Sequence, residues 1–163
     1  MTAALLHYYY GDKPQLVEAV ITQRLLPVLE SIRTPLLQAG DLGDAVGVFV
    51  HGVCAAVTRH PWLPSLWVRE VVSEGGALRD LLVTRFGPTI APLLAQRFAQ
   101  AQQAGRLNPD LDPRLLMASL VGLTLFPAAG APIWRQLFDA QDLGMDDVRR
   151  HALALLDRGL ELT

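Results

Sequence analysis

The stretch that most constrains the fold of this chain is the run between Arg114 and Arg135, which contains no charged side chain. Pro127 and Pro132 interrupt the run, so the apolar helix that it predicts ends at Phe126. That helix is shorter than the roughly 20 residues that a membrane span requires. Its apolar side chains fall on every side, and a helix that is hydrophobic all round has to be covered all round. We therefore expect a buried helix and no membrane span.

The rest of the chain predicts further helices, separated by glycine and proline. The expected spans are Lys13 to about Arg33 with a kink at Pro27, a loop from Thr34 to Gly43, and helices from Asp41 to Arg59, from Trp62 to about Glu74, from Leu78 to Ala104 with a bend at Gly87-Pro88, and from Asp146 to about Gly159. Asp41 and Asp112 are placed to cap two of the helix starts. The 163 residues, 51% of them hydrophobic, suffice for a substantial core. The sequence therefore predicts an all-α helical bundle.

Two of these helices, from Arg114 to Phe126 and from Asp146 to Gly159, carry more apolar faces than one small domain needs to cover. Each also has small residues along one stripe, which would let the helices of a second copy approach closely. We therefore expect a homodimer whose interface contains Ala118, Gly122, Leu125, Val148, Ala152, Leu155, Leu156 and Gly159.

Motifs of enzymes and metal sites do not occur in the sequence. The chain lacks a glycine-rich phosphate loop, a Gly-x-Ser-x-Gly motif and a cysteine pair, and its four histidines are scattered. Cys54, the single cysteine, excludes an internal disulfide and suits a reducing cytoplasm. We expect no catalytic residue, no metal and no cofactor in a cytoplasmic, non-enzymatic protein. The less favoured alternative, an enzyme on a helical scaffold, would be revealed by turnover assays with hydrolase and transferase substrates.

The beginning of the chain predicts a short helix and a capped turn. Leucines and tyrosines recur at helical spacing from Leu5 to Tyr10, Gly11 can end this helix, and Asp12 with Gln15 forms a capping box for the next one. The string L-L-H-Y-Y-Y-G-D-K-P-Q-L resembles the end of the DNA-binding domain of TetR-type transcriptional regulators. There, a short recognition helix runs through such a turn into a long connecting helix.

A second string, G-R-L-N-P-D-L-D-P at residues 105–113, resembles the segment before the penultimate main helix in many TetR-type proteins. The resemblance implies that residues 1–12 are part of a DNA-binding domain and that residues 13–163 form a ligand-binding and dimerisation domain. It assigns DNA contacts to Thr2, His7, Tyr8, Tyr9 and Lys13. The family's DNA-binding domain has three helices and this sequence begins at the third, so the resemblance implies that the first two are lacking and that operator binding depends on them.

The resemblance also implies a ligand site enclosed by the helices between Asp41 and Phe126. Mostly apolar side chains with a few polar groups are typical of such sites, and the candidates are His51, Cys54, Trp67, Val71, Phe98, Met117, Val121 and Thr124. No charged side chain falls on the inward stripes, so the expected ligand is small, apolar, and neutral or weakly polar. The implied function is transcriptional regulation, with repression released by this ligand. The alternative is a dimeric ligand-binding helical domain without DNA activity of its own.

Overall fold

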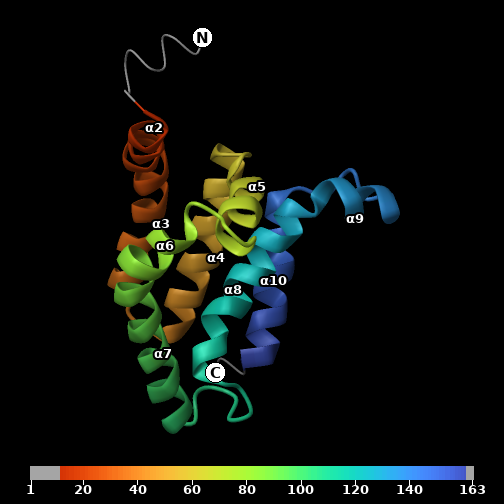
Figure 1. Cartoon of the computed structure of the whole chain (residues 1–163). Helices are drawn as coiled ribbons and strands as arrows, with labels where there is room; N and C mark the ends of the chain where they lie inside the picture. The colour runs from red at the N-terminus through yellow and green to blue at the C-terminus, as the bar shows by residue number, and fades with distance from the viewer. Residues whose placement is uncertain (1–11, 161–163) are drawn as a thin grey trace.

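The computed structural model describes residues 12–160, and every regular element in that range is helical (Figure 1). The α-helices are α2 (Lys13–Val20), α3 (Leu26–Gln38), α4 (Leu42–Arg59), α5 (Leu63–Trp67), α6 (Arg79–Leu81), α7 (Gly87–Gln103), α8 (Pro113–Ala129), α9 (Ala131–Leu137) and α10 (Met145–Leu160). Three π-helical segments continue some of them, namely η1 (Ile21–Leu25), η2 (Val68–Val72) and η3 (Leu82–Phe86). The predicted all-α fold is confirmed.

Helix α4 lies at the centre of the bundle, where α3, α8 and α10 pack against it (Figure 1). Half of its residues are buried, among them Phe49, Val50 and Val53. By length and composition α4 could cross a membrane, as could α8 and α9 taken together, but half of the α4 stretch is buried inside the fold. This burial is what the central helix of a bundle requires.

Three aspartates cap helix starts through the same hydrogen bond, in which a side-chain oxygen accepts from a backbone amide in the first turn. Asp12 accepts from the amide of Gln15 at 2.9 Å, and Asp41 accepts from that of Asp44 at 2.8 Å. Asp112 accepts from the amide of Arg114 at 2.9 Å. The helix starts predicted from these aspartates are therefore confirmed.

The first helical unit, formed by α2, η1 and α3, is a single rod that reaches Gln38. The predicted end at Arg33 and the predicted loop from residue 34 onward were wrong, because the helix continues through Pro35 and buries Leu36 to 2% exposure. At Pro27, where we expected a kink, the turn before the proline widens instead. The amide of Leu26 there donates to the carbonyl of Ile21, five residues back. A proline ring collides with the carbonyl four residues back, and the wider turn accommodates it.

A widened, π-helical turn also precedes Pro88, where the amide of Gly87 donates to the carbonyl of Leu82. The predicted bend at this point is thus a π-helical turn within one continuous unit from α6 to α7. The helix that starts at Leu63 ends at Val72, two residues before the predicted end.

Helix α8 extends through Pro127 to Ala129, so its predicted end at Phe126 was wrong. A proline in the last turn removes only one hydrogen bond there, and the amide of Gly130 still donates to the carbonyl of Phe126 at 2.9 Å. At Gly130 the chain turns by 70° into α9, which projects from the body (Figure 1). The residues after Gly130, for which the sequence predicted no helix, therefore form a helix that points away from the bundle.

Candidate functional site

A narrow apolar cleft separates the rod from the helices that follow α4. Its walls are Leu25 and Leu29 of the rod, Leu63, Leu66, Trp67 and Val71 of α5 and η2, and Leu78, Leu81, Leu82 and Phe86 around α6 and η3. All of these side chains are apolar, and the cavity volume is about 30 Å³. This volume is far below the roughly 300 to 1,000 Å³ of typical small-molecule pockets. In this state the cleft is too narrow for a ligand of that size.

All three π-helical segments contribute to this cleft, η1 through Leu25, η2 through Val71, and η3 through Leu82 and Phe86. A π-turn has one residue more than an α-turn, and such turns are frequent at functional sites. Two of the predicted ligand residues, Trp67 and Val71, line the cleft. The other residues of the cleft were not predicted as site residues. The available signal was their helical spacing, which places them on one apolar face of each of three separate helical segments.

The rod is anchored more firmly at its C-terminal end than at its N-terminal end. The Arg97 guanidinium of α7 donates to the carbonyls of Ala39 at 3.2 Å and of Leu37 at 3.5 Å, where α3 ends. Cations are favourable at helix C-termini because the free carbonyls point there. At the other end, α2 packs extensively only against the next turn of its own rod. Its Glu18 reaches Arg85 of η3 at 3.6 Å, in an exposed ion pair.

Four more of the predicted ligand residues lie in or against the core of α7 and α8, and not along the cleft. Phe98 is 1% exposed, and Met117 and Val121 pack partly buried against the same core. Thr124 is fully buried, and its hydroxyl donates to the carbonyl of Leu120 at 2.9 Å. The hydroxyl therefore has its hydrogen bond within α8.

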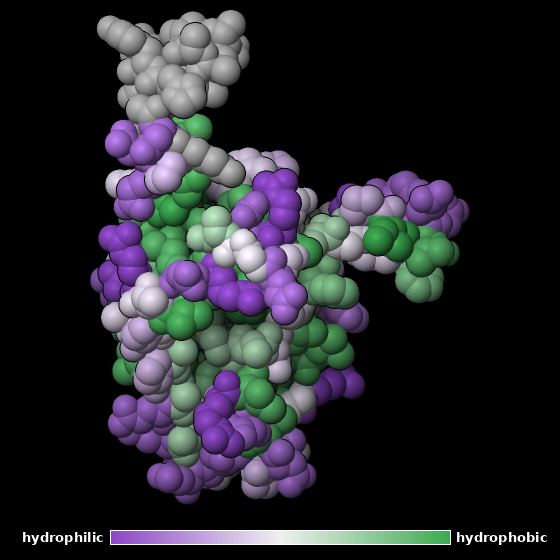
Figure 2. All heavy atoms as spheres, viewed as in Figure 1, coloured by the Kyte–Doolittle hydropathy of each residue, from purple (hydrophilic) through white to green (hydrophobic). Residues whose placement is uncertain are grey.

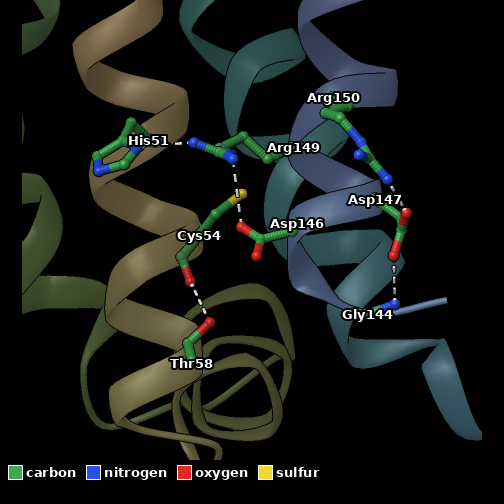
Figure 3. Close-up of polar contacts among 8 residues, drawn as sticks. All are labelled: His51, Cys54, Thr58, Gly144, Asp146, Asp147, Arg149 and Arg150. Carbon is green, nitrogen blue, oxygen red and sulfur yellow. Dashed lines mark hydrogen bonds and ion pairs between the residues drawn. The ribbon is translucent and has the colours of Figure 1, made fainter.

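The last two predicted ligand residues, His51 and Cys54, belong to a polar contact between α4 and α10 (Figure 3). The Arg149 guanidinium donates to Nδ1 of the exposed His51 at 3.1 Å and reaches Asp146 at 3.3 Å. Cys54 is buried beside them, and burial raises the pKa of its thiol; Arg149 opposes this rise and Asp146 adds to it. An arginine only donates, so His51 Nδ1 is the acceptor. These residues thus form a polar contact that links α4 to α10.

The predicted dimer residues separate into two groups. Ala118, Gly122, Leu155 and Gly159 are exposed, whereas Leu125, Val148, Ala152 and Leu156 are buried within the same copy. A Cβ added at Gly122 or at Gly159 would meet nothing within 4 Å. Packing among residues 12–160 therefore gives no reason for a glycine at either position.

The predicted DNA contacts at Thr2, His7, Tyr8 and Tyr9 lie outside the described residues. Lys13 opens α2, but its side chain is likewise outside the described part of the structure. These five assignments remain predictions.

No family model matches the sequence, and the comparison with curated proteins found no match. Among solved structures, the chain is similar to a crystal structure described as a "putative TetR-family transcriptional regulator from Rhodococcus sp.". The two sequences are 24% identical, the TM-score is 0.57, and the match covers 96% of this chain and 80% of the other. At this level of identity the similarity concerns the fold, and the chain therefore has an all-α, TetR-like fold.

Proposed function

We propose that this chain is a non-enzymatic transcriptional regulator of the TetR type, a homodimeric repressor that a small apolar ligand releases from operator DNA. The observation that carries the proposal is the shared wall of the cleft. The rod that follows the N-terminal residues contributes Leu25 and Leu29 to the same cleft as the body residues Trp67, Val71 and Phe86. A ligand in this cleft would contact the rod and the body at once.

The narrowness of the cleft supports the coupling. A ligand of typical size enters only if the walls separate, so its binding free energy favours an open arrangement over the narrow one. The two hydrogen bonds from Arg97 to the carbonyls of Leu37 and Ala39 fix the C-terminal end of the rod. When the cleft opens, the N-terminal half of the rod then rotates about this fixed end. In a dimer, such a movement changes the spacing of the two DNA-binding regions, and half-site spacing is a requirement of dimeric helix-turn-helix proteins.

The chemistry of the cleft defines the class of ligand. Every lining side chain is apolar, so an ionised ligand would lose its hydration without gaining a partner. Neutral alkyl or aromatic compounds are the expected ligands, and medium-chain alcohols and alkylbenzenes are suitable probes. The cytoplasmic location, the homodimer and the DNA contacts at Thr2, His7, Tyr8, Tyr9 and Lys13 are parts of the same proposal.

A matched pair of substitutions tests the cleft. Val71→Trp places a large ring in a cavity of about 30 Å³. We expect it to abolish the thermal stabilisation that a binding alcohol or alkylbenzene, the hit, gives to the wild-type chain. Val72→Trp makes the same change at the neighbouring exposed position and is expected to preserve it. Equal stabilisation of both variants by the hit would refute the cleft as the ligand site.

The coupling is tested by the distance between the two rods of a dimer. A spin label at Gln15→Cys, in a Cys54→Ala background, reports this distance with and without the ligand. We expect a shift on ligand binding. Release of DNA is measured by gel shift on a chain that also carries the two preceding helices on which the resemblance makes operator binding depend, and we expect the ligand to release a fragment that this longer chain binds selectively. Ligand binding with an unchanged distance and no selective DNA binding would favour the alternative, a dimeric ligand-binding domain without DNA activity.

A further inference from the structure

One end of the molecule exposes large apolar side chains that no other part of the described chain covers. Phe126 of α8 is 75% exposed, Ile133 and Leu137 of α9 are 66% and 72% exposed, and Phe138 after α9 is 76% exposed. Figure 2 shows hydrophobic atoms on the projection that α9 forms in Figure 1. Monomeric proteins rarely expose contiguous apolar patches larger than a few hundred Å². Such a concentration of exposed apolar side chains marks an interaction surface.

The projection, residues 131–138, is a built feature, which we call the arm. The indole Nε1 of Trp134 donates to the carbonyl of Pro127 at 2.7 Å, across the 70° turn between α8 and α9. The Arg135 guanidinium lies 5.3 Å from the centroid of the Trp134 ring, within the range of a cation–π interaction. The hydrogen bond joins the arm to α8, and the second contact lies within the arm, so the arm is an ordered helix attached to the body.

A groove lies between the arm and α10. Its apolar lining consists of Phe126, Pro127, Trp134, Phe138, Leu143 and Val148, and its volume is about 690 Å³. Asp147 and His151 are the ionisable residues on its lining. The same chain thus carries a projecting apolar arm and, beside it, an apolar groove of a size that accepts several side chains.

A second copy of this chain is the occupant that these surfaces fit. A two-fold interface is self-complementary, so one copy's arm and groove both find partners when two copies meet. The surface continues along α8 to Gly122, where a Cβ would meet nothing within 4 Å and a second helix has room to approach. The surfaces also offer partners of opposite charge, because exposed Asp139 and Asp142 follow α9, and the exposed residues of α10 include Arg150 and Arg158 beside Asp146 and Asp157.

We propose that the two copies exchange arms: the arm of each lies against α8 and α10 of the other, and a partner helix fills the groove beneath it. The proposal rests on the homodimer proposed above and adds to it the segment that grips the partner. In this arrangement Ile133, Leu137 and Phe138 leave water together, which assigns to the interface three of the four most exposed large hydrophobic side chains of the described chain.

The test measures the dissociation constant of the full chain by sedimentation over a range of concentrations. The variant Ile133→Asp/Leu137→Asp places two charges on the arm, and we expect it to weaken the dimer at least 100-fold. The control Val72→Asp/Val83→Asp changes two exposed valines elsewhere and is expected to shift the constant less than 2-fold. Circular dichroism confirms that both variants fold. For the wild-type chain, amide exchange at residues 131–138 should slow at least 5-fold in the dimer.

The possible outcomes distinguish failure of the arm proposal from failure of the homodimer proposal. If the wild-type chain dimerises while the arm variant dimerises equally well and residues 131–138 exchange at an unchanged rate, the arm proposal fails and the homodimer stands. If the wild-type chain stays monomeric at about 100 μM, both the arm proposal and the homodimer proposal fail. A monomer that binds vesicles of phosphatidylcholine and phosphatidylglycerol through the arm would assign the apolar face to a lipid surface and overturn the proposal.

Discussion

Gly122→Ala gives a prediction in which folding stability and dimer stability change in opposite directions. Gly122 lies within α8, and a Cβ there would meet nothing within 4 Å in a single copy. A glycine in a helix interior costs about 0.5 to 1 kcal/mol relative to alanine. The substitution should therefore raise the free energy of unfolding of the monomer by about that amount, and the midpoint of thermal unfolding by about 1 to 4 °C.

The dimer should respond in the opposite way if helices of two copies approach closely at Gly122. Each additional methyl group in a packed interface costs about 1 kcal/mol or more, and two-fold symmetry places two of them there. A loss of about 2 kcal/mol corresponds to a dissociation constant about 30-fold higher.

The assay combines urea unfolding, at concentrations below the dissociation constant, with sedimentation equilibrium. Gly47→Ala is the matched control, because a Cβ at Gly47 in α4 also meets nothing within 4 Å. It should show the gain in folding stability without weakening the dimer. A Gly122→Ala chain that is more stable and dimerises as tightly as the wild type would refute the close approach. A less stable monomer would contradict the open space around this glycine.

Three further predictions concern single residues. Phe98→Ala, at a side chain 1% exposed, should lower the free energy of unfolding by about 3 to 5 kcal/mol in urea titrations; a loss below 1 kcal/mol would contradict its place in the core. The hydrogen bond and charge of Arg114 lower the pKa of Asp112 from 3.8 to about 2, so the stability that its ionised form contributes should be present above pH 4 and fade as the pH falls to 2. Because Asp112→Asn lacks this charge, its stability difference from the wild type should shrink over that interval, and a constant difference would refute the argument. Burial raises the pKa of Cys54, so a thiol reagent at pH 8 should modify the native chain far more slowly than the urea-unfolded chain, and equal rates would contradict its burial.

Local signals predicted the helix starts better than the helix ends. The ends predicted at Arg59, Ala104 and Gly159 agree with the structure to within one residue, whereas those at Arg33 and Phe126 were wrong. An aspartate before a helix acts on the amides of the next turn, so Asp12, Asp41 and Asp112 could be interpreted without knowing the rest of the fold. The effect of a proline depends on what the helix packs against beyond it. Burial of Leu36 carries α3 past Pro35, and a hydrogen bond from Gly130 to Phe126 carries α8 past Pro127. The burial of Leu36 is a tertiary contribution and is absent from a local pattern, whereas the bond at Gly130 lies within the helix itself.

The candidate site was likewise predicted only in part from the sequence. Helical periodicity correctly placed Trp67 and Val71 on an inward face, and both line the cleft. Periodicity does not say which neighbour a face meets, so His51 was predicted to face a pocket, and the structure places it against Arg149 of α10. The arm was missed because its apolar side chains follow two prolines and suggested a chain break. The dimer and the DNA contacts remain predictions.

The π-helical turn in the rod affects how chimeras of this protein should be designed. Because η1 contains one residue more than an α-helical turn, the face of α2 is rotated by about 100° from where an uninterrupted α-helix would place it. A foreign DNA-binding region fused before Ile21 would inherit this rotation, whereas one fused after Leu25 would lose it. Two fusions that look equivalent in an alignment would thus aim their operator-reading surfaces in different directions. Deletion of a single residue within η1 would be the direct way to bring them back into phase.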